Sequence, residues 1–140
     1  MYQLTTEHSF DSAHFLAGYQ GKCGNLHGHR WRVLLTVESE SLQEDPQQRG
    51  MCVDFAHLKQ DLREELDRMD HVLIIEENTL KQNTMKALQE EGFSVVEMPF
   101  RPTAENFAAY FYKLYTSKGY SVAKVEVYET PNNCAVYSEA

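Results

Sequence analysis

Apolar and polar residues alternate over four stretches of the chain, at 2–15, 29–38, 122–129 and 134–137. An alternation with a period of two places the apolar side chains on one face of an extended strand and the polar ones on the other. Two of these stretches come early in the chain and two come late, so that each pair predicts a hairpin. The first hairpin has a long connection with several glycines, over residues 18–28.

Two further stretches repeat their apolar residues at three- and four-residue steps, which is the pattern of a helix with one buried face. The first comprises Phe55, Leu58, Leu62, Leu66 and Met69. The second comprises Phe107, Phe111, Leu114 and Tyr115. Asp54 and Thr103 precede these patterns, and each can cap its helix by accepting a hydrogen bond from the first turn. Glu105 falls in the first turn of the second helix, where the helix dipole favours an acid.

The segment between the two helices predicts a small insert. Residues 72–75 form a short apolar run, residues 83–91 favour a helix that Gly92 ends, and residues 93–100 are extended. Helices that fall between two hairpins pack together on one side of the resulting sheet. The sequence thus predicts an α+β fold, with a four-stranded antiparallel sheet, two main helices on one face and a small helical insert between them.

Length, charge and cysteine content limit the class of protein. The 140 residues suit one domain, 1–140, with its own hydrophobic core. The formal net charge of −8 argues against a nucleic-acid partner held through its phosphates. No apolar run approaches the length that crosses a bilayer, so no membrane partner is expected. The cysteines are three and far apart, and no signal-peptide pattern begins the sequence, which predicts reduced thiols in a cytoplasmic protein.

The most informative motif is His27-x-His29, preceded along the chain by His14. Residues two apart on a strand point to the same side, so both imidazoles can hold one ion. If the strand that carries His14 pairs alongside, its ring supplies a third nitrogen. Three nitrogens leave one tetrahedral position open, which is typical of a catalytic zinc site. A lone His-x-His motif is more often an ordinary exposed pair, and the residues alone leave the two interpretations evenly balanced.

Cys23 lies four residues before His27 and allows three interpretations. As a fourth zinc ligand it would close the site and make it structural. As a thiolate beside a metal-bound substrate it would serve as a base. It could also be an inert cysteine.

Two acidic positions are weaker candidates. Asp70 can orient the imidazole of His71, although such a dipeptide is more often ordinary exposed sequence. Glu129 ends the strand at 122–129, where a carboxylate can accept two hydrogen bonds from a paired N–H edge such as that of a pterin or guanine. A solvated turn residue is the alternative interpretation of Glu129.

Together these motifs resemble the 6-pyruvoyltetrahydropterin synthase and 6-carboxytetrahydropterin synthase family. The matching pieces occur in the family's order over nearly the whole chain: Phe10-x-x-Ala13-His14, Cys23-Gly24-x-Leu26-His27-Gly28-His29, Val53-Asp54-Phe55 with Leu58-Lys59, Asp70-His71, Pro102-Thr103-Ala104-Glu105-Asn106 and Tyr128-Glu129-Thr130. The resemblance implies a tunnelling fold, whose subunits associate into rings. A hexamer of two trimers, or a tetramer, is therefore expected.

The resemblance also implies a role for each matching residue. His14, His27 and His29 would bind Zn²⁺, and Cys23 would be the catalytic base. Asp70 and His71 would complete its proton relay, and they can serve the zinc of a neighbouring subunit because family sites lie at interfaces. Glu129 would anchor the pterin ring. Thr103 and Glu105 would line the pocket.

The implied substrate is 7,8-dihydroneopterin triphosphate. We expect the carboxy branch, which yields 6-carboxy-5,6,7,8-tetrahydropterin, acetaldehyde and triphosphate for queuosine and related deazapurines. The alternatives are a pyruvoyl branch that eliminates triphosphate, and a noncatalytic pterin-binding module. The chain departs from the family pattern in the long segment between His71 and Pro102. The sequence also leaves open which basic residues bind the triphosphate, among Lys22, Arg30, Arg32, Lys81 and Arg101.

Overall fold

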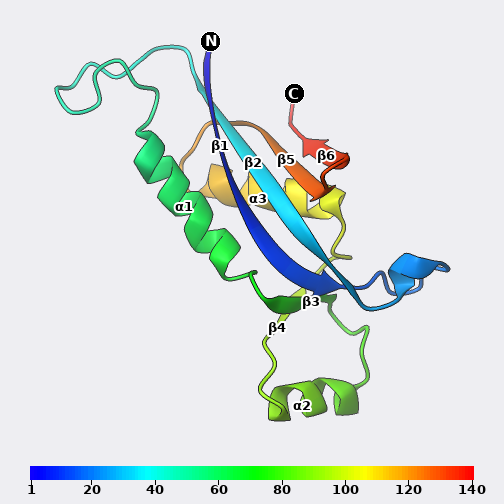
Figure 1. The fold of residues 1–140 in the computed structure, drawn as a ribbon. Coiled ribbons are helices and arrows are strands. Elements are labelled where there is room, and N and C mark those ends of the chain that lie inside the picture. The colour runs from blue at the N-terminus through cyan, green and yellow to red at the C-terminus, as the bar shows by residue number, and fades with distance from the viewer.

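The computed structural model describes residues 1–140, in which three α-helices accompany six strands (Figure 1). The strands are β1 (Tyr2–His14), β2 (His27–Ser39), β3 (Val72–Glu76), β4 (Val95–Met98), β5 (Val122–Thr130) and β6 (Asn133–Tyr137). The helices are α1 (Phe55–Asp67), α2 (Gln82–Glu90) and α3 (Ala104–Ser117). A short 3-10 helix, Lys22–Gly24, lies in the connection between β1 and β2.

The sheet has the strand order β4-β3-β1-β2-β5-β6. The four predicted strands are neighbours and run antiparallel, as expected. The prediction of a four-stranded, purely antiparallel sheet is nevertheless wrong, because β3 and β4 extend it parallel to β1. Only two residue pairs, Ser12–Val72 and Ala13–Leu73, join β3 to β1. Such a short pairing depends on the free edge that β1 offers in the folded protein, which the local sequence of the insert does not reveal.

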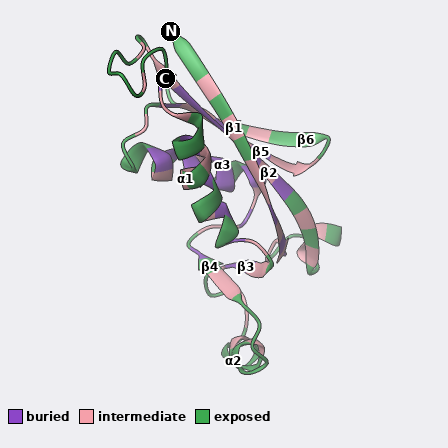
Figure 2. Ribbon diagram, turned by 60° about the vertical axis from the view of Figure 1, so that its left-hand side comes forward, coloured by how far each residue is buried: buried purple, intermediate pink, exposed green.

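The hydrophobic core lies between the sheet and helices α1 and α3, which cover one of its faces as predicted (Figures 1 and 2). The core lies on this face because apolar and polar side chains alternate along the strands. Trp31, Val33 and Leu35 point from β2 toward the helices and are fully buried, while Arg30 and Arg32 point to the other face. On α1 the predicted stripe supplies three fully buried leucines, Leu58, Leu62 and Leu66.

Both predicted N-caps form. Asp54 accepts a hydrogen bond from Ala56 N at 2.9 Å, and Thr103 accepts one from Asn106 N at 3.2 Å. Helix α2 lies within one residue of its predicted range, buries no residue and stands away from the rest of the protein (Figure 2). No helix is both long and apolar enough to cross a membrane.

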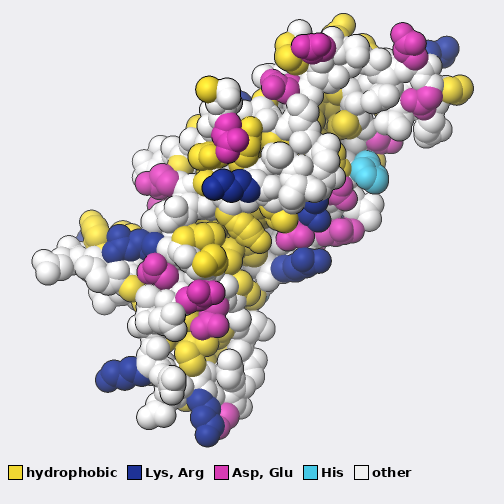
Figure 3. Space-filling model, turned by 180° about the vertical axis from the view of Figure 1, so that it is seen from behind, with side chains coloured by type: hydrophobic (Ala, Val, Ile, Leu, Met, Phe, Trp, Pro, Cys, Tyr) yellow, Lys and Arg dark blue, Asp and Glu magenta, His cyan; other side chains and the backbone are white.

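On the face seen in Figure 3, lysines and arginines are interspersed with aspartates and glutamates around a hydrophobic group of side chains.

Candidate metal centre

Three histidines converge where β1 and β2 end. The antiparallel pairing sets His14 opposite His27, and His29 lies two residues along β2 from His27. All three side chains point to the face that the helices cover. The Nε2 atoms of His14 and His27 are 3.1 Å apart, and the ring centres of the three pairs are 4.6–5.0 Å apart. The predicted set His14, His27 and His29 is therefore brought together by the folded chain.

Backbone carbonyls fix the orientation of two of these rings. Nδ1 of His14 donates to the carbonyl oxygen of Pro102 at 2.8 Å, and Nδ1 of His27 donates to that of Asn25 at 2.6 Å. A proton held at Nδ1 leaves the lone pair of Nε2 available. This is the arrangement that orients histidines in metal sites, where a carbonyl or carboxylate holds the ring nitrogen that does not bind the ion.

Burial favours the uncharged form of two of these histidines, His14 and His29. His14 is 1% exposed, and burial lowers its pKa from 6.5 to about 4, although the hydrogen bond to Pro102 opposes the shift. Burial also lowers the pKa of His29, against the attraction of the Glu129 carboxylate. A neutral imidazole is the form that binds a metal ion, so no proton has to be removed first.

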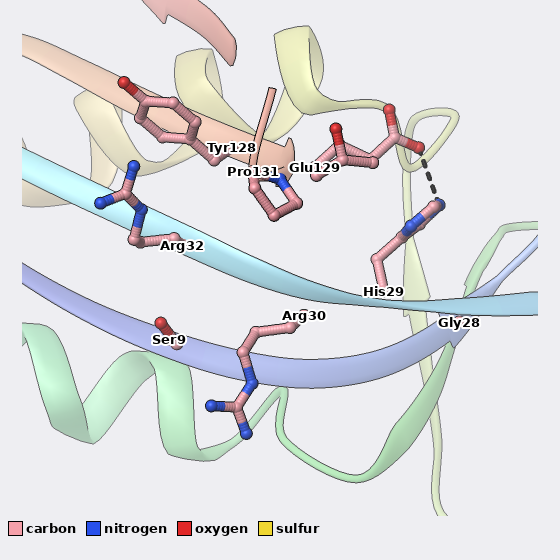
Figure 4. A pocket seen from close by; sticks show the side chains of 9 residues that line it. Ser9, Gly28, His29, Arg30, Arg32, Tyr128, Glu129 and Pro131 are labelled. Carbon is pink, nitrogen blue, oxygen red and sulfur yellow. Dashed lines mark ion pairs between the residues drawn. The ribbon is translucent and has the colours of Figure 1, made fainter. Parts of the chain in front are cut away.

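Glu129 joins the three histidines from β5. Its Oε1 lies 3.0 Å from Nε2 of His29 and 3.6 Å from Nε2 of His14 (Figure 4). The four ligand atoms lie within 4.8 Å of one another, and the buried Nε2 of His29 has no hydrogen-bond partner.

The three imidazoles fit zinc. Imidazole nitrogens are among its usual ligands, three of them leave one tetrahedral position open, and two nitrogens on one tetrahedral zinc lie about 3.3 Å apart. The 3.1 Å between His14 and His27 is close to that value.

A cavity of about 520 Å³ reaches His29 and Glu129 from the face of the sheet opposite the helices. It opens because β2 and β5 pair only as far as Arg32 and Tyr128, beyond which the two strands separate. Figure 4 shows the side chains around it; Ser9 comes from β1 and Arg30 from β2. The volume lies in the ordinary range of small-molecule sites.

Cys23 is not one of the side chains that converge in this cluster. It is half-buried in the 3-10 turn, and its thiol is free. Its carbonyl accepts a hydrogen bond from Leu16 N at 2.8 Å, which folds the loop back on itself. The next residue must be glycine, because a Cβ at Gly24 would lie 2.5 Å from the carbonyl oxygen of Tyr19. The four side chains that converge are thus three histidines and Glu129, not the three histidines and Cys23.

Asp70 and His71 form a second cluster together with Asp11. Nδ1 of His71 lies 2.7 Å from Oδ2 of Asp70, whose Oδ1 accepts from the Asp11 backbone N–H at 2.8 Å. The latter bond, followed by the contact with His71, lowers the pKa of the Asp70 carboxyl. His71 adopts a φ of +58°, and its backbone N–H donates to Asp11 O.

This second cluster does not meet the histidine cluster of the same chain. Asp11 precedes Ser12 on β1 and so points away from the helix-covered face, whereas His14 points toward it. The His71 side chain is 78% exposed. The dipeptide therefore has the predicted internal contact and lies open to solvent or to a partner.

The chain matches the model of the 6-pyruvoyl tetrahydropterin synthase family over residues 3–140. It belongs to this family. A 6-carboxy-5,6,7,8-tetrahydropterin synthase of Haemophilus influenzae is 32% identical, over 99% of this chain and 100% of the relative. The enzyme of the same name from Rickettsia bellii is 33% identical, over 94% and 96%. A crystal structure of Plasmodium vivax 6-pyruvoyl tetrahydropterin synthase, 22% identical over 99% of this chain and 97% of that one, has the same fold with a TM-score of 0.67.

Membership of the 6-pyruvoyl tetrahydropterin synthase family confirms the resemblance that the motifs indicated. The roles of individual residues stay predictions. Thr103 caps α3, and Glu105 is exposed in its first turn. This segment contacts the histidine cluster through the carbonyl of Pro102, which the sequence did not predict. A backbone carbonyl leaves no signal in the residue type that carries it, and only the fold places it beside His14.

Proposed function

We propose that the protein is a zinc-dependent carbon–carbon lyase that converts 7,8-dihydroneopterin triphosphate and one water to 6-carboxy-5,6,7,8-tetrahydropterin, acetaldehyde and triphosphate, in queuosine biosynthesis. The observation that carries the proposal is the convergence of three imidazoles and Glu129 at the end of an accessible cavity. The names of the two curated relatives favour the carboxy branch. The free cysteines are compatible with the cytoplasmic location expected from the sequence.

The proposed roles follow from where the donors point. Nε2 of His14, His27 and His29 would hold the ion, which supplies Lewis-acid polarisation of the substrate's side-chain oxygens. Glu129 would accept hydrogen bonds from the paired N–H groups of the pterin edge, which orients the ring beside the ion. Cys23 would remove a proton from the substrate side chain as a thiolate.

The proton relay requires a second chain in this proposal. Asp70 and His71 lie away from the histidine cluster of their own chain, and His71 is largely exposed. We therefore assign them to the site of a neighbouring subunit in a homo-oligomer, a hexamer of two trimers or a tetramer. Asp70 would hold the His71 tautomer through Nδ1, which leaves Nε2 free to exchange a proton with the substrate.

A second candidate is elimination of triphosphate with retention of the side chain, the activity for which the matching family model is named. Both activities use the same substrate and release triphosphate, but they differ in the pterin that is formed and in whether acetaldehyde is released. A noncatalytic pterin-binding module is the remaining alternative, and it would bind substrate without converting it.

Product analysis tests the proposal. Zinc-loaded protein is incubated with 7,8-dihydroneopterin triphosphate, and the mixture is examined by mass spectrometry with a separate assay for acetaldehyde. The proposal expects 6-carboxytetrahydropterin and acetaldehyde in equal amounts. A pyruvoyl pterin without acetaldehyde would assign the protein to the second candidate, and unchanged substrate would favour the binding module. The matched control is Cys23→Ala, which should keep its zinc and form no product; loss of zinc from this variant would make the thiol a ligand instead.

A further inference from the structure

The cavity that reaches the histidine cluster has two chemically different ends (Figure 4). One end carries His29 and the Glu129 carboxylate. The other carries the guanidinium of Arg32 beside the ring of Tyr128, with Arg30 below it. A ligand that fills the cavity lengthwise would therefore present hydrogen-bond donors and metal-binding oxygens at one end and negative charge at the other.

Arg32 is held in place and keeps hydrogen-bonding capacity. Its guanidinium carbon lies 4.1 Å from the centre of the Tyr128 ring, and this stacking fixes the plane of the group. One nitrogen lies 3.4 Å from a carboxylate oxygen of Glu7, on the exposed side. An arginine has five N–H donors, so most of them remain available to a bound anion.

Arg30 lies two residues away on β2 and points to the same face, since strand side chains repeat with a period of two. Its Nε and one terminal nitrogen each donate to Asp11 at 3.0 Å. This bidentate pair orients the side chain and compensates much of its charge. Arg30 should thus contribute less to binding an anion than Arg32 does.

The other basic candidates from the sequence do not line this cavity. Arg101 donates to the carbonyl oxygen of Ala17 at 2.6 Å, Lys81 occupies the N-cap position of the outlying helix α2, and Lys22 lies in the loop between β1 and β2. In a protein with a net charge of −8, a bound polyanion needs cationic side chains placed next to it.

We propose that Arg32, assisted by Arg30, binds the polyphosphate tail of the substrate while His29 and Glu129 receive its head. The identity of the head rests on the proposed function; the anion subsite itself rests on the two arginines and the cavity. The subsite takes a linear polyphosphate ester, and it selects against the dephosphorylated compound.

The test measures binding of inorganic tripolyphosphate by titration calorimetry in low-salt buffer. Wild-type protein is compared with Arg32→Ala, Arg30→Ala and the matched control Arg49→Ala, which removes an exposed arginine from the loop before α1. We expect affinity to fall about 10- to 100-fold for Arg32→Ala, less for Arg30→Ala and not at all for Arg49→Ala. Arg32→Lys should be intermediate, because lysine keeps the charge and loses the planar fork and the stacking. No binding by the wild type, or equal loss in all three alanine variants, would overturn the proposal.

A second comparison separates this proposal from the proposed function. Binding of 7,8-dihydroneopterin and of its triphosphate is measured for the wild type and for Arg32→Ala, with circular dichroism to verify folding. The subsite predicts weaker binding of the triphosphate alone. Equal weakening of both ligands, or of neither, would refute the subsite while leaving the lyase assignment intact. If the wild type forms no product but Arg32→Ala still loses tripolyphosphate, the subsite stands and the assigned reaction is wrong.

Discussion

The two histidine-containing clusters of this protein place the same side chain in opposite environments. His14, His27 and His29 are packed at the helix-covered end of β1 and β2, and burial holds His14 neutral. His71 is largely exposed and contacts a carboxylate. Dehydration favours a neutral ligand for a metal ion, whereas an exposed imidazole with a carboxylate partner is suited to gaining and losing protons. In the proposed function, the buried cluster holds the ion and the exposed one moves protons.

Removing a ring from the buried cluster should have the largest effect. His27→Ala removes one of the converging nitrogens and should abolish stoichiometric zinc binding, with a loss of turnover of at least about 1,000-fold. Zinc is measured by elemental analysis of purified protein, and turnover by product formation. His57→Ala, on the exposed side of α1, is the control and should keep both. Full zinc content in His27→Ala would show that the three histidines are not the ligand set.

A substitution in the exposed cluster should lower turnover without loss of zinc. His71→Ala should lose about 100- to 10,000-fold in turnover, because a proton-transfer group is gone, and should keep its zinc.

Mixing His27→Ala with His71→Ala subunits then tests whether the relay serves a neighbour. After reassembly, sites shared between chains should recover about a quarter of the wild-type activity, since each site draws its two halves at random. No recovery in mixed oligomers would place both clusters of one site on the same chain.

The buried cluster should also make stability depend on pH. The folded pKa of His14 is about 4 and the unfolded value is 6.5, so the unfolded chain binds more protons between these values. In the metal-free protein, neutral His14 should make its full contribution to the free energy of unfolding above pH 6.5. This contribution should be lost as the pH falls toward 4, by about 3 kcal/mol in total. Urea unfolding at pH 7 and pH 4.5, at one protein concentration, measures the change. A free energy of unfolding that did not fall over this range would contradict the burial of a neutral His14.

The smallest effect concerns the support of the buried cluster. Thr103→Ala removes the cap of α3, next to the carbonyl that orients His14, and should cost about 1 kcal/mol of stability. Asp54→Ala removes the cap of α1 at a similar cost and is the matched control. Only Thr103→Ala should also weaken zinc binding, by a few-fold in a chelator competition. Equal zinc affinity in both variants would show that the cap does not help to orient His14.

The local pattern of apolar and polar residues was sufficient to predict most of the helices and strands. The alternation predicted the four antiparallel strands, and the three- and four-residue spacing predicted α1 and α3 with their caps. The spacing of His27 and His29, with His14 on the pairing strand, predicted the convergence of the three rings, since a hairpin register follows from residues that are near in sequence. The pairing of β3 and β4 with the edge of β1 could not be predicted in this way, because it joins segments that are distant along the chain and have weak patterns of their own.

The sequence by itself determined the secondary structure of the main elements, the family and the convergence of the three histidines. Tertiary structure alone decided that Glu129 joins the histidines, that Pro102 orients His14, and that Asp70 and His71 lie on another side of the sheet. It also selected Arg30 and Arg32 among the basic residues, by placing them on the cavity. The physical reason is that periodicity fixes the side of an element on which a residue lies, whereas the distance between elements depends on how their faces pack.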